Sequence, residues 1–379
     1  MPNPRSRLAR LATAGAFVAS RLRASAVPDE PAGFADAVAG LPAGAARATA
    51  IVALRPGTDW LDTGIDVAPG ETVTILGHGR LWMSQRLGIG CGARVALWHR
   101  LGAAGRIAKA LGDSTTFVAE AGGTLQLATK PPGEWLDERG RFDPTVPRRG
   151  MRGQLDVAIV VWRAADGLST AAAANPHGLF AREETRRATA PALPPGWEPL
   201  WRIGGGSIYR GEAIDGRAAM TCRTHGDVGI VRRPVDLALD DDTRLAWSWR
   251  VHDLPSALPE DLTPTHDYLS IAVEFENGRD LTYLWSSGLQ VGTSFHCPLA
   301  WWSERESHLV VRSGRQGLGQ WLDEERTVLA DYRAVIGGPP PARLVAVWLI
   351  AVSVFQQRAG ACDYGRIAVA SAGRSIDLL

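Results

Sequence analysis

Short apolar runs of strand length, separated by glycine, proline and aspartate, recur along most of this 379-residue chain. The clearest run, residues 244–251, alternates apolar and polar side chains, and residues 268–276 repeat the alternation. A period of two places alternate side chains on opposite faces of a β-strand, so each run predicts a strand with one buried face. Residues 344–354 are almost all apolar and predict a central strand that is buried on both faces. The pattern predicts an all-β protein.

Further strands follow from the same pattern in both halves of the chain. The predicted strands are residues 49–54, 71–76, 95–99, 124–128, 155–161, 281–285, 308–312 and 365–370. Many short strands with turn residues between them are typical of sandwiches and barrels. Residues 323–334 are charged instead, and they predict one helix. We expect two β-sandwich domains of jelly-roll or galactose-binding-like type.

The length of the chain predicts more than one domain, because single hydrophobic cores stop growing at roughly 250–300 residues. An Ala- and Pro-rich stretch, residues 166–196, separates the two groups of strands and predicts a linker. Residues 183–188 could form one short helix within it. We therefore expect a leader and flexible segment at 1–47, a first sandwich at 48–165 and a second sandwich at 197–379.

Charge and composition narrow the range of partners. The net charge is +1, so the chain has no strong field of one sign, and nucleic acid is not expected as a partner. Fourteen tryptophans stand against five tyrosines. Tryptophan fills large cores, and an exposed indole also offers a flat apolar face on which a sugar ring can stack. We expect most tryptophans in the core and a few at a ligand surface.

The first 28 residues leave the location of the protein open. They contain no acidic residue, a weakly apolar run spans residues 11–20, and residues 24–26 resemble a small-residue cleavage site. Arg21 and Arg23 interrupt this signal-like pattern. A periplasmic or secreted location and a cytoplasmic one both stay open. No stretch of 18 or more apolar residues occurs, so no membrane span is expected.

The four cysteines, Cys91, Cys222, Cys297 and Cys362, are far apart and show no C-x-x-C motif. Two disulfides, if the protein is exported, and four buried thiols are both compatible with this spacing. Neither a metal nor a cofactor is expected, because zinc-ligand spacing and Walker loops are absent. The histidines occur singly and are interpreted as structural.

The C-terminal half, from about Trp197 onward, carries several distinctive strings. They are Leu245-x-Trp-x-Trp249-Arg-Val251, Asp267-Tyr268, Phe275-Glu276, Tyr283-x-Trp285, Val310-Val-Arg-Ser-Gly314, Gly319-Gln-Trp321-x-x-Glu324-Glu-Arg326, Asp331-Tyr332-Arg333 and Gly338-Pro-Pro340. This half resembles a bacterial family known as domain of unknown function 3047. The resemblance implies an exported jelly-roll sandwich without an established activity. An acidic cluster that is usual in that family is replaced here by Ser-Val-Phe-Gln-Gln-Arg at residues 353–358.

The N-terminal half, residues 57–163, carries a second set of strings. They are Trp60-x-Asp62-Thr-Gly64-Ile-x-Val67-x-x-Gly70-Glu71-x-Val73, Gly102-Ala-Ala-Gly-Arg106-Ile107 and Gly123-x-Leu125-x-Leu127. This half resembles the bacterial galactophilic lectin-like sandwich. That resemblance implies a calcium and sugar site near the end of the domain, but the corresponding stretches are Thr129-Lys130 and Arg148-Arg149-Gly150. These residues cannot form the oxygen-rich shell that calcium requires, so the fold is expected to carry over and the calcium site is not.

Glu274 and Glu276 are the candidate catalytic residues. Two residues apart on a strand, their side chains share one face, with Cα atoms about 6.5–7 Å apart. Paired carboxylates at such separations serve as acid and base or nucleophile in glycoside hydrolysis. A solvated strand face without catalytic function is the alternative.

Six residues are candidate ligand contacts: Trp301, Trp302, Trp321, Asp267, Tyr268 and Arg326. The tryptophans could stack on a sugar, and the polar residues could bond its hydroxyls. Structural alternatives also stand: a hydrophobic loop plug for Trp301 and Trp302, a structural role for Asp267 and Tyr268, and an ion-pair network around residues 323–333 for Arg326.

Three functions remain open from the sequence. The first is a carbohydrate-binding protein that recognises glycan by aromatic stacking and polar contacts. The second is a polysaccharide-active enzyme, of hydrolase or lyase type, that uses Glu274 and Glu276. The third is a non-catalytic structural or protein-binding envelope component. Glycan or a small polar ligand is the expected partner, and the sequence does not determine the oligomeric state.

Overall fold

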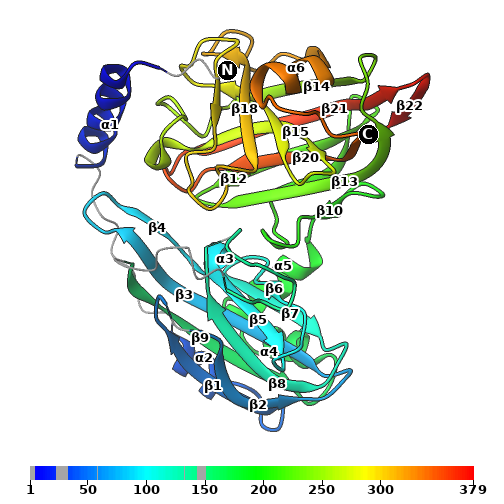
Figure 1. The fold of residues 1–379 in the computed structure, drawn as a ribbon. Helices are drawn as coiled ribbons and strands as arrows, with labels where there is room; N and C mark the ends of the chain where they lie inside the picture. Colours follow the sequence, from blue (N-terminus) through cyan, green and yellow to red (C-terminus); the bar gives the residue numbers. More distant parts are fainter. Residues whose placement is uncertain (1–4, 23–32, 58, 132, 143–150) are drawn as a thin grey trace. The chain divides into compact units, whose positions relative to one another are not determined.

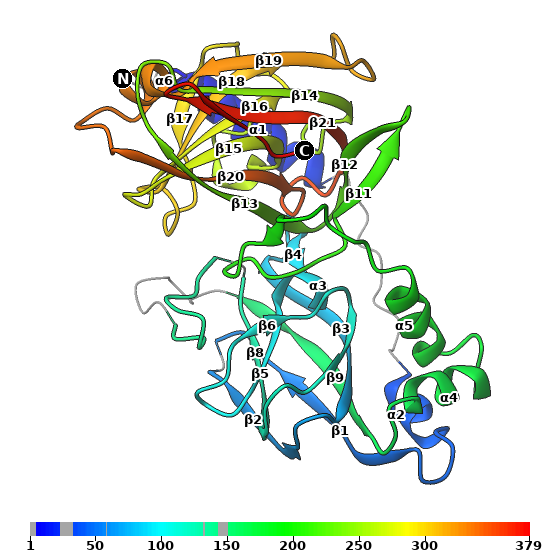
Figure 2. The same ribbon diagram turned by 90° about the vertical axis from the view of Figure 1, so that its right-hand side faces the viewer.

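The computed structural model describes residues 5–22, 33–57, 59–131, 133–142 and 151–379, which form two compact units (Figures 1 and 2). The N-terminal unit comprises Ser25–Ala190 and Trp201–Ser207. The C-terminal unit comprises Pro191–Leu200 and Ile208–Leu379, together with the first segment of the chain, Met1–Ala24. Both units are built mainly of β-strands, so the predicted all-β class is confirmed.

Within the described residues, the N-terminal unit is a sandwich of a five-stranded and a four-stranded sheet. The first sheet has the order β1-β9-β3-β4, with β7 also paired to β3, and the second has the order β2-β8-β5-β6. Their bounds are β1 (Ala46–Leu54), β2 (Leu61–Val67), β3 (Thr72–Ser84), β4 (Ile89–Cys91), β5 (Leu97–Leu101), β6 (Ala108–Lys109), β7 (Ser114–Val118), β8 (Gly123–Thr129) and β9 (Arg152–Trp162). A short helix, α3 (Ala93–Ala96), precedes β5. Each of the five strands predicted in this half overlaps one of these.

Helices occupy part of the region predicted as a linker. In the N-terminal unit, α2 (Phe34–Ala39), α4 (Gly167–Ala174) and α5 (Leu179–Ala188) lie near the end of β9. Leu168 and Phe180 are buried against Trp162, so these helices are anchored by an apolar cluster. Apolar residues spaced among the alanines let this segment pack on the sandwich.

The C-terminal unit is a second sandwich, with a seven-stranded sheet facing a six-stranded sheet among the described residues. The seven-stranded sheet has the order β10-β13-β20-β15-β16-β18-β17. Its bounds are β10 (Glu198–Pro199), β13 (Val228–Ala238), β15 (Tyr268–Phe275), β16 (Asp280–Ser286), β17 (Ser294–His296), β18 (Glu306–Ser313) and β20 (Arg343–Val352). β20 is paired on both sides and buried, as predicted for residues 344–354.

The six-stranded sheet has the order β11-β12-β21-β14-β19, with β22 also paired to β21. Its bounds are β11 (Tyr209–Ile214), β12 (Arg217–His225), β14 (Arg244–Asp253), β19 (Leu322–Thr327), β21 (Ala359–Ser371) and β22 (Arg374–Asp377). The alternation in β14 turns Trp247 and Trp249 into the core, where they contact Tyr283 and Trp285 of the facing sheet. The opposite face of β14 is therefore free to carry polar side chains.

The charged segment 323–334 is only half helical. Residues 322–327 form strand β19, which pairs with β14, and the helix α6 (Val328–Val335) begins after it. Leu322, Glu324 and Arg326 share the more buried face of β19, and the Trp249 Nε1 donates a hydrogen bond to the Glu324 Oε1 over 3.3 Å. The prediction of one helix was wrong because this alternation is carried mostly by charged residues.

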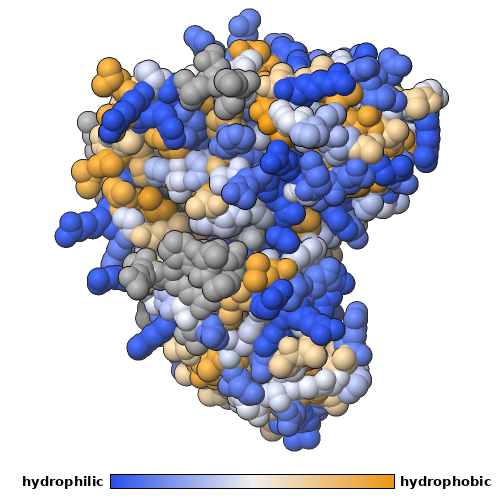
Figure 3. All heavy atoms as spheres, viewed as in Figure 1, coloured by the Kyte–Doolittle hydropathy of each residue, from blue (hydrophilic) through white to orange (hydrophobic). Residues whose placement is uncertain are grey.

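The helix α1 (Arg7–Leu22) packs on the C-terminal unit. Arg5, just before it, forms an ion pair with Asp261, and Phe17 is buried. Its other face exposes Leu8, Leu11 and Leu22. Figure 3 shows hydrophobic residues on the side of the unit where Figure 1 places α1. In the described part of the chain, no helix combines the length and apolarity needed to cross a membrane.

Candidate functional site

The outer face of the six-stranded sheet brings polar side chains from three adjacent strands together. Arg250 on β14 lies opposite Asp363 on β21, and Thr221 on β12 lies opposite Asp363 on the other side. The side chains of Arg223 and His252, one on each neighbouring strand, reach the same carboxylate. The period of two in each strand is what turns these residues away from the core.

Asp363 is the centre of this cluster, and its side chain is 1% exposed. Its Oδ1 accepts a hydrogen bond from the Arg223 Nη2 over 2.8 Å. Its Oδ2 accepts from the Arg250 Nε over 3.1 Å and the Arg250 Nη2 over 2.9 Å, and lies 2.7 Å from the His252 Nε2. The carboxylate therefore fixes three partly exposed donor side chains in one orientation.

Trp321 lies beside this cluster, just before β19. Its side chain is 38% exposed, and the Arg250 guanidinium is 4.9 Å from the ring centroid. A Cβ atom at residue 365 would lie 3.2 Å from the Trp321 Cζ3 and 2.5 Å from the Ser248 Oγ. Only glycine at this position lets the indole lie this close to β21 while part of its surface stays open.

A cavity of about 560 Å³ lies at the end of this sheet, where β14 ends and β21 begins. Its lining includes Asp253 at the end of β14, Ala359 at the start of β21 and Leu318 in the loop that leads to Trp321. Arg315 and Arg358 also line it, so it offers charged hydrogen-bonding groups. We call Trp321, the Asp363 cluster and this cavity together the outer-face site.

Two opposing effects act on the pKa of Asp363. Burial alone would raise the pKa, but the hydrogen bonds from His252, Arg223 and Arg250 outweigh burial and lower it below the usual aspartate range. The carboxylate is therefore ionised at neutral pH, which keeps the two arginines and the histidine in place.

This shift predicts a pH dependence. Because folding lowers the pKa of Asp363, its ionised form stabilises the fold above the unfolded-state pKa of about 3.9, and that contribution is lost as the pH falls through the folded-state value. Wild type is therefore expected to exceed Asp363→Asn in free energy of unfolding by more at pH 6 than at pH 3. Urea unfolding at both pH values measures this, with Asp323→Asn, an exposed neighbour on β19, as the control. Equal differences at the two values would contradict the assignment.

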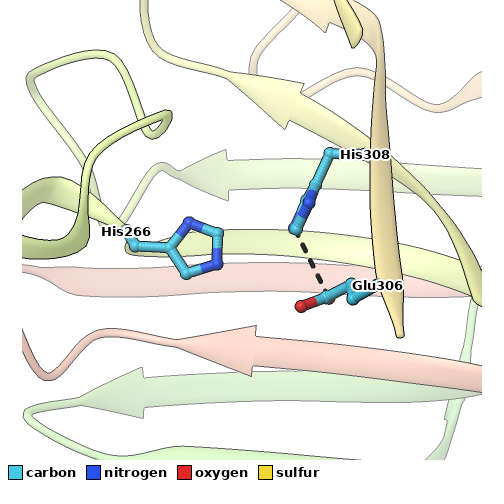
Figure 4. A group of neighbouring side chains, drawn as sticks. All are labelled: His266, Glu306 and His308. Carbon is cyan, nitrogen blue, oxygen red and sulfur yellow. Dashed lines mark ion pairs between the residues drawn. The ribbon is translucent and has the colours of Figure 1, made fainter. Parts of the chain in front are cut away.

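A second cluster is buried on the face of the seven-stranded sheet that points away from the core between the two sheets (Figure 4). Glu306 and His308 sit two residues apart on β18 and point to the same side, and His266 reaches them from the loop before β15. The three side chains are at most 2% exposed, and one ligand-type atom from each lies within 4.8 Å of the others. Their donor atoms are those that bind transition metals.

Burial controls the protonation of this cluster. It lowers the pKa of His266 to about 4, although the Glu260 carbonyl and Asp261 oppose the shift, and it lowers the pKa of His308 well below 6.5. Burial raises the pKa of Glu306 and also that of its cross-strand neighbour Asp280, which the Glu306 carboxylate raises further. Both imidazoles are therefore neutral at pH 7, and the two carboxyl groups share a site where they resist ionising together.

The two predicted catalytic residues, Glu274 and Glu276, have different surroundings. Glu274 is half-buried on β15, but the strand ends at Phe275, where the pairing with β20 becomes irregular. Glu276 is exposed beyond the strand, and its Oε1 accepts a hydrogen bond from the Ala342 backbone N–H over 2.7 Å. The two carboxylates therefore do not share a continuous strand face, and neither lines the cavity of the outer-face site.

Burial corrects the expectation for three of the predicted ligand contacts. Trp302 is 6% exposed, Tyr268 is 3% exposed, and Asp267 is fully buried. Asp267 accepts hydrogen bonds from the backbone N–H groups of Phe355 and Gln356, and the Tyr268 hydroxyl donates to the Glu306 Oε1 over 2.8 Å. These side chains are out of reach of a ligand that docks on the surface.

The other predicted ligand contacts differ in accessibility. Arg326 forms an ion pair with Asp331, whose carboxylate also accepts from the Tyr283 hydroxyl, so it connects β19 to α6. This is the structural alternative described for Arg326 above. Trp301 is partly exposed, and Trp321 is the more open of the two tryptophans that stay accessible. Their ligand contacts remain predictions.

Sequence reasoning missed both clusters that the fold assembles. The outward positions of β14 gave one signal, because Arg250 and His252 alternate with core tryptophans and valine. Glu306 and His308 gave another, since two ligand-type residues at a spacing of two share one strand face. Their partners Asp363, Arg223 and His266 come from distant parts of the chain, which the spacing could not reveal.

The stretch compared with the lectin calcium site is partly described. Thr129 and Lys130 are buried, and the Lys130 Nζ lies 4.1 Å from the centroid of the Phe142 ring. Arg148-Arg149-Gly150 lies outside the described residues. All four cysteines lie in the described part of the chain, and each is a buried free thiol.

Comparison with known proteins finds a family that resembles the C-terminal unit. The family described as Protein of unknown function (DUF3047) matches almost all of its sandwich. Residues 196–368 resemble DUF3047. The DUF3047 match confirms the similarity predicted for this half, and its range contains the Asp363 cluster, Trp321 and the buried His–Glu–His cluster. No protein of curated function matches the chain.

Several solved structures are also similar. The N-terminal domain of EclA, a PllA-like lectin, is 16% identical with a TM-score of 0.23, over 29% of this chain and 94% of that one. The xyloglucanase domain of NopAA from Sinorhizobium fredii is 8% identical with a TM-score of 0.30, over 48% and 96%. A tandem CBM22 domain of Xyn10C from Paenibacillus barcinonensis is 11% identical with a TM-score of 0.23, over 81% and 80%. At these TM-scores the similarities carry no functional information.

Proposed function

We propose that the C-terminal unit binds carbohydrate at the outer-face site. The observation that supports this most is the partly open indole of Trp321, placed beside a fixed set of hydrogen-bonding side chains on a sheet face. A sugar ring has one apolar face and a rim of hydroxyls, so it needs a flat apolar platform together with polar groups at its edge. Trp321 supplies the platform, and Arg223, Arg250 and His252 supply the rim.

Fixed donors make the site suited to a neutral polar ligand. Asp363 orders the two guanidinium groups before a ligand arrives, so little side-chain entropy remains to be lost on binding. Arg223 is 53% exposed and keeps N–H groups available to solvent or ligand. The cavity at the end of the sheet provides further polar contacts from Asp253, Arg315 and Arg358 for a second sugar unit.

Trp321→Ala is expected to weaken glycan binding at least about tenfold, or about 1.4 kcal/mol, because it removes the stacking platform. Purified full-length protein is titrated with a panel of neutral and acidic oligosaccharides and polysaccharides. Binding is followed by calorimetry and by tryptophan fluorescence. Trp301→Ala is the matched control, since it removes another partly exposed indole outside the outer-face site.

Each outcome of that titration distinguishes the three functions. Loss of binding in Trp321→Ala alone supports the proposal, and loss in Trp301→Ala alone moves the site to the loop after β17. Released reducing ends, measured in the same samples and abolished by Glu274→Gln or Glu276→Gln, would make the protein an enzyme. No binding to any glycan would overturn the proposal and favour a structural or protein-binding role.

A periplasmic or secreted location would suit a protein that meets polysaccharide, and it stays a prediction from the first 28 residues. The oligomeric state stays undetermined.

A further inference from the structure

The buried cluster of the seven-stranded sheet contains a fourth ligand-type atom. The Cys297 Sγ lies 3.4 Å from the His266 Nε2, and the Cys297 side chain is 2% exposed. Glu306 is a hydrogen-bonding neighbour of the same thiol. Two imidazoles, a carboxylate and a thiol thus meet in one buried place, although they come from the loop before β15, the segment after β17 and strand β18.

The orientation of His266 turns its Nε2 toward the cluster, where the Cys297 thiol is its neighbour. Its Nδ1 lies 2.8 Å from the Glu260 backbone carbonyl oxygen. A carbonyl oxygen only accepts, so Nδ1 carries the hydrogen and Nε2 presents a lone pair toward the cluster. A backbone carbonyl that fixes the tautomer in this way is the usual second partner of a metal-binding histidine.

Among the described residues the His308 ring makes no short hydrogen bond, and its Nε2 lies 3.4 Å from the Glu306 Oε1. The His308 side chain is 0% exposed. The ring stacks on Phe295 at 4.6 Å and meets His266 edge-on at 5.0 Å, so it is held in place by packing. An unsatisfied buried polar group destabilises a protein by about 1–3 kcal/mol, so a rigid imidazole that meets the Glu306 carboxyl only at 3.4 Å is suited to bind a ligand.

Two separations among these ligand atoms match those around a tetrahedral ion, and the ligand atoms of His266, Glu306 and His308 lie within 4.8 Å of one another. The His308 Nε2 lies 3.4 Å from the Glu306 Oε1, and the His266 Nε2 lies at the same 3.4 Å from the Cys297 Sγ. A tetrahedral zinc with bonds of about 2.0–2.3 Å holds its ligand atoms roughly 3.3–3.8 Å apart. The Glu306 Oε1 is also oriented by the Tyr268 hydroxyl, as expected of a metal-bound carboxylate.

We propose that His266, Cys297, Glu306 and His308 bind a zinc ion that stabilises the C-terminal unit. Nitrogen and sulfur ligands select zinc over calcium and magnesium, which prefer oxygen. Four protein ligands that are all buried make a closed site, which is typical of structural zinc and leaves no open position for a substrate. The neighbouring Asp280 Oδ2, which has no hydrogen-bond partner within the described residues, is a further polar atom beside the cluster.

Metal content tests the proposal directly. Full-length protein made without a polyhistidine tag is unfolded with a chelator and refolded with or without zinc, because the closed site must be filled as the chain folds. After dialysis, wild type is expected to retain about one zinc per chain and to melt roughly 5–10 °C higher than the zinc-free sample. His308→Gln and Cys297→Ser are expected to retain less than about a tenth as much zinc. His296→Gln is the matched control, since His296 is exposed on the adjacent strand β17.

Cobalt gives a readout that misfolding cannot imitate. Co²⁺ bound to wild type is expected to show thiolate charge-transfer absorption in the near ultraviolet together with tetrahedral d–d bands. Cys297→Ser should lose the charge-transfer absorption, and His296→Gln should keep both signals. The proposal is overturned if wild type retains no zinc after refolding, or if the His308 and Cys297 variants retain as much as wild type. A cobalt complex of wild type without thiolate absorption would also overturn it.

Discussion

Replacing Trp249 with alanine is expected to lower the free energy of unfolding of the C-terminal unit by about 3–5 kcal/mol. The Trp249 side chain is fully buried, and its ring packs against Trp247 and Trp285, each at a centroid distance of 5.6 Å. Its removal leaves a large cavity between the two sheets, and the Glu324 carboxylate loses the indole N–H that it accepts. Both effects destabilise the fold.

Differential scanning calorimetry of the full-length chain measures this effect, because each unit can unfold in its own transition. The transition of the C-terminal unit is expected to move down, and that of the N-terminal unit to stay. Trp321→Ala is the control, since a partly exposed indole contributes far less to stability, and we expect a change within about 1 kcal/mol. Similar losses in the two variants would mean that Trp321 is a core residue and would weaken the proposed sugar platform.

Glu260→Ala is expected to cost about 3 kcal/mol and to reduce zinc retention at the same time. The buried Glu260 carboxylate accepts hydrogen bonds from the Ser256 hydroxyl, the Ser286 hydroxyl and the Ser287 backbone N–H. Alanine leaves these three donors without their acceptor. It also frees the loop whose Glu260 carbonyl fixes His266, so the proposed metal ligand loses its orientation.

Chemical denaturation and metal analysis of the same samples test both parts. Glu260→Gln keeps one acceptor oxygen and the side-chain volume, so it should fall between wild type and Glu260→Ala in both measurements. If Glu260→Ala destabilises the protein but retains zinc at the wild-type level, then the loop does not position His266. That result would separate the contribution of the loop to folding from its contribution to the metal site.

The sequence predicted well the strands whose apolar side chains are buried in the core. Alternation in residues 244–251 and the apolar run 344–354 both reflect burial, which is a local property of each side chain. Strand β19, residues 322–327, was not predicted from this pattern. It is held by cross-strand pairing to β14, and its charged residues do not show the alternation of apolar side chains that marks a strand. In the stretch predicted as a linker, Leu168 and Phe180 pack on Trp162, a contact that the Ala- and Pro-rich composition does not indicate.

The sites were harder to predict than the strands, because they depend on register. Asp363 meets Arg250 only through the pairing of β21 with β14, more than one hundred residues apart in the chain. His266 meets His308 only because the loop before β15 lies over β18. Single histidines look structural in a sequence until the topology places two of them side by side. Trp321 was named from the sequence, and its contact with a ligand stays a prediction.

The strand order of the C-terminal unit has a consequence for synthesis on the ribosome. β20 is inserted between β13 and β15, and β21 between β12 and β14, so the last two long strands complete the middle of both sheets. Until residues 343–371 leave the exit tunnel, four strand edges have no neighbour and the two halves of each sheet cannot join. The N-terminal unit can fold while the chain grows, but the C-terminal unit must wait for nearly its whole sequence. A ribosome that stalls late in translation would release a chain with open, aggregation-prone edges, and we expect chaperones to engage this protein at that stage.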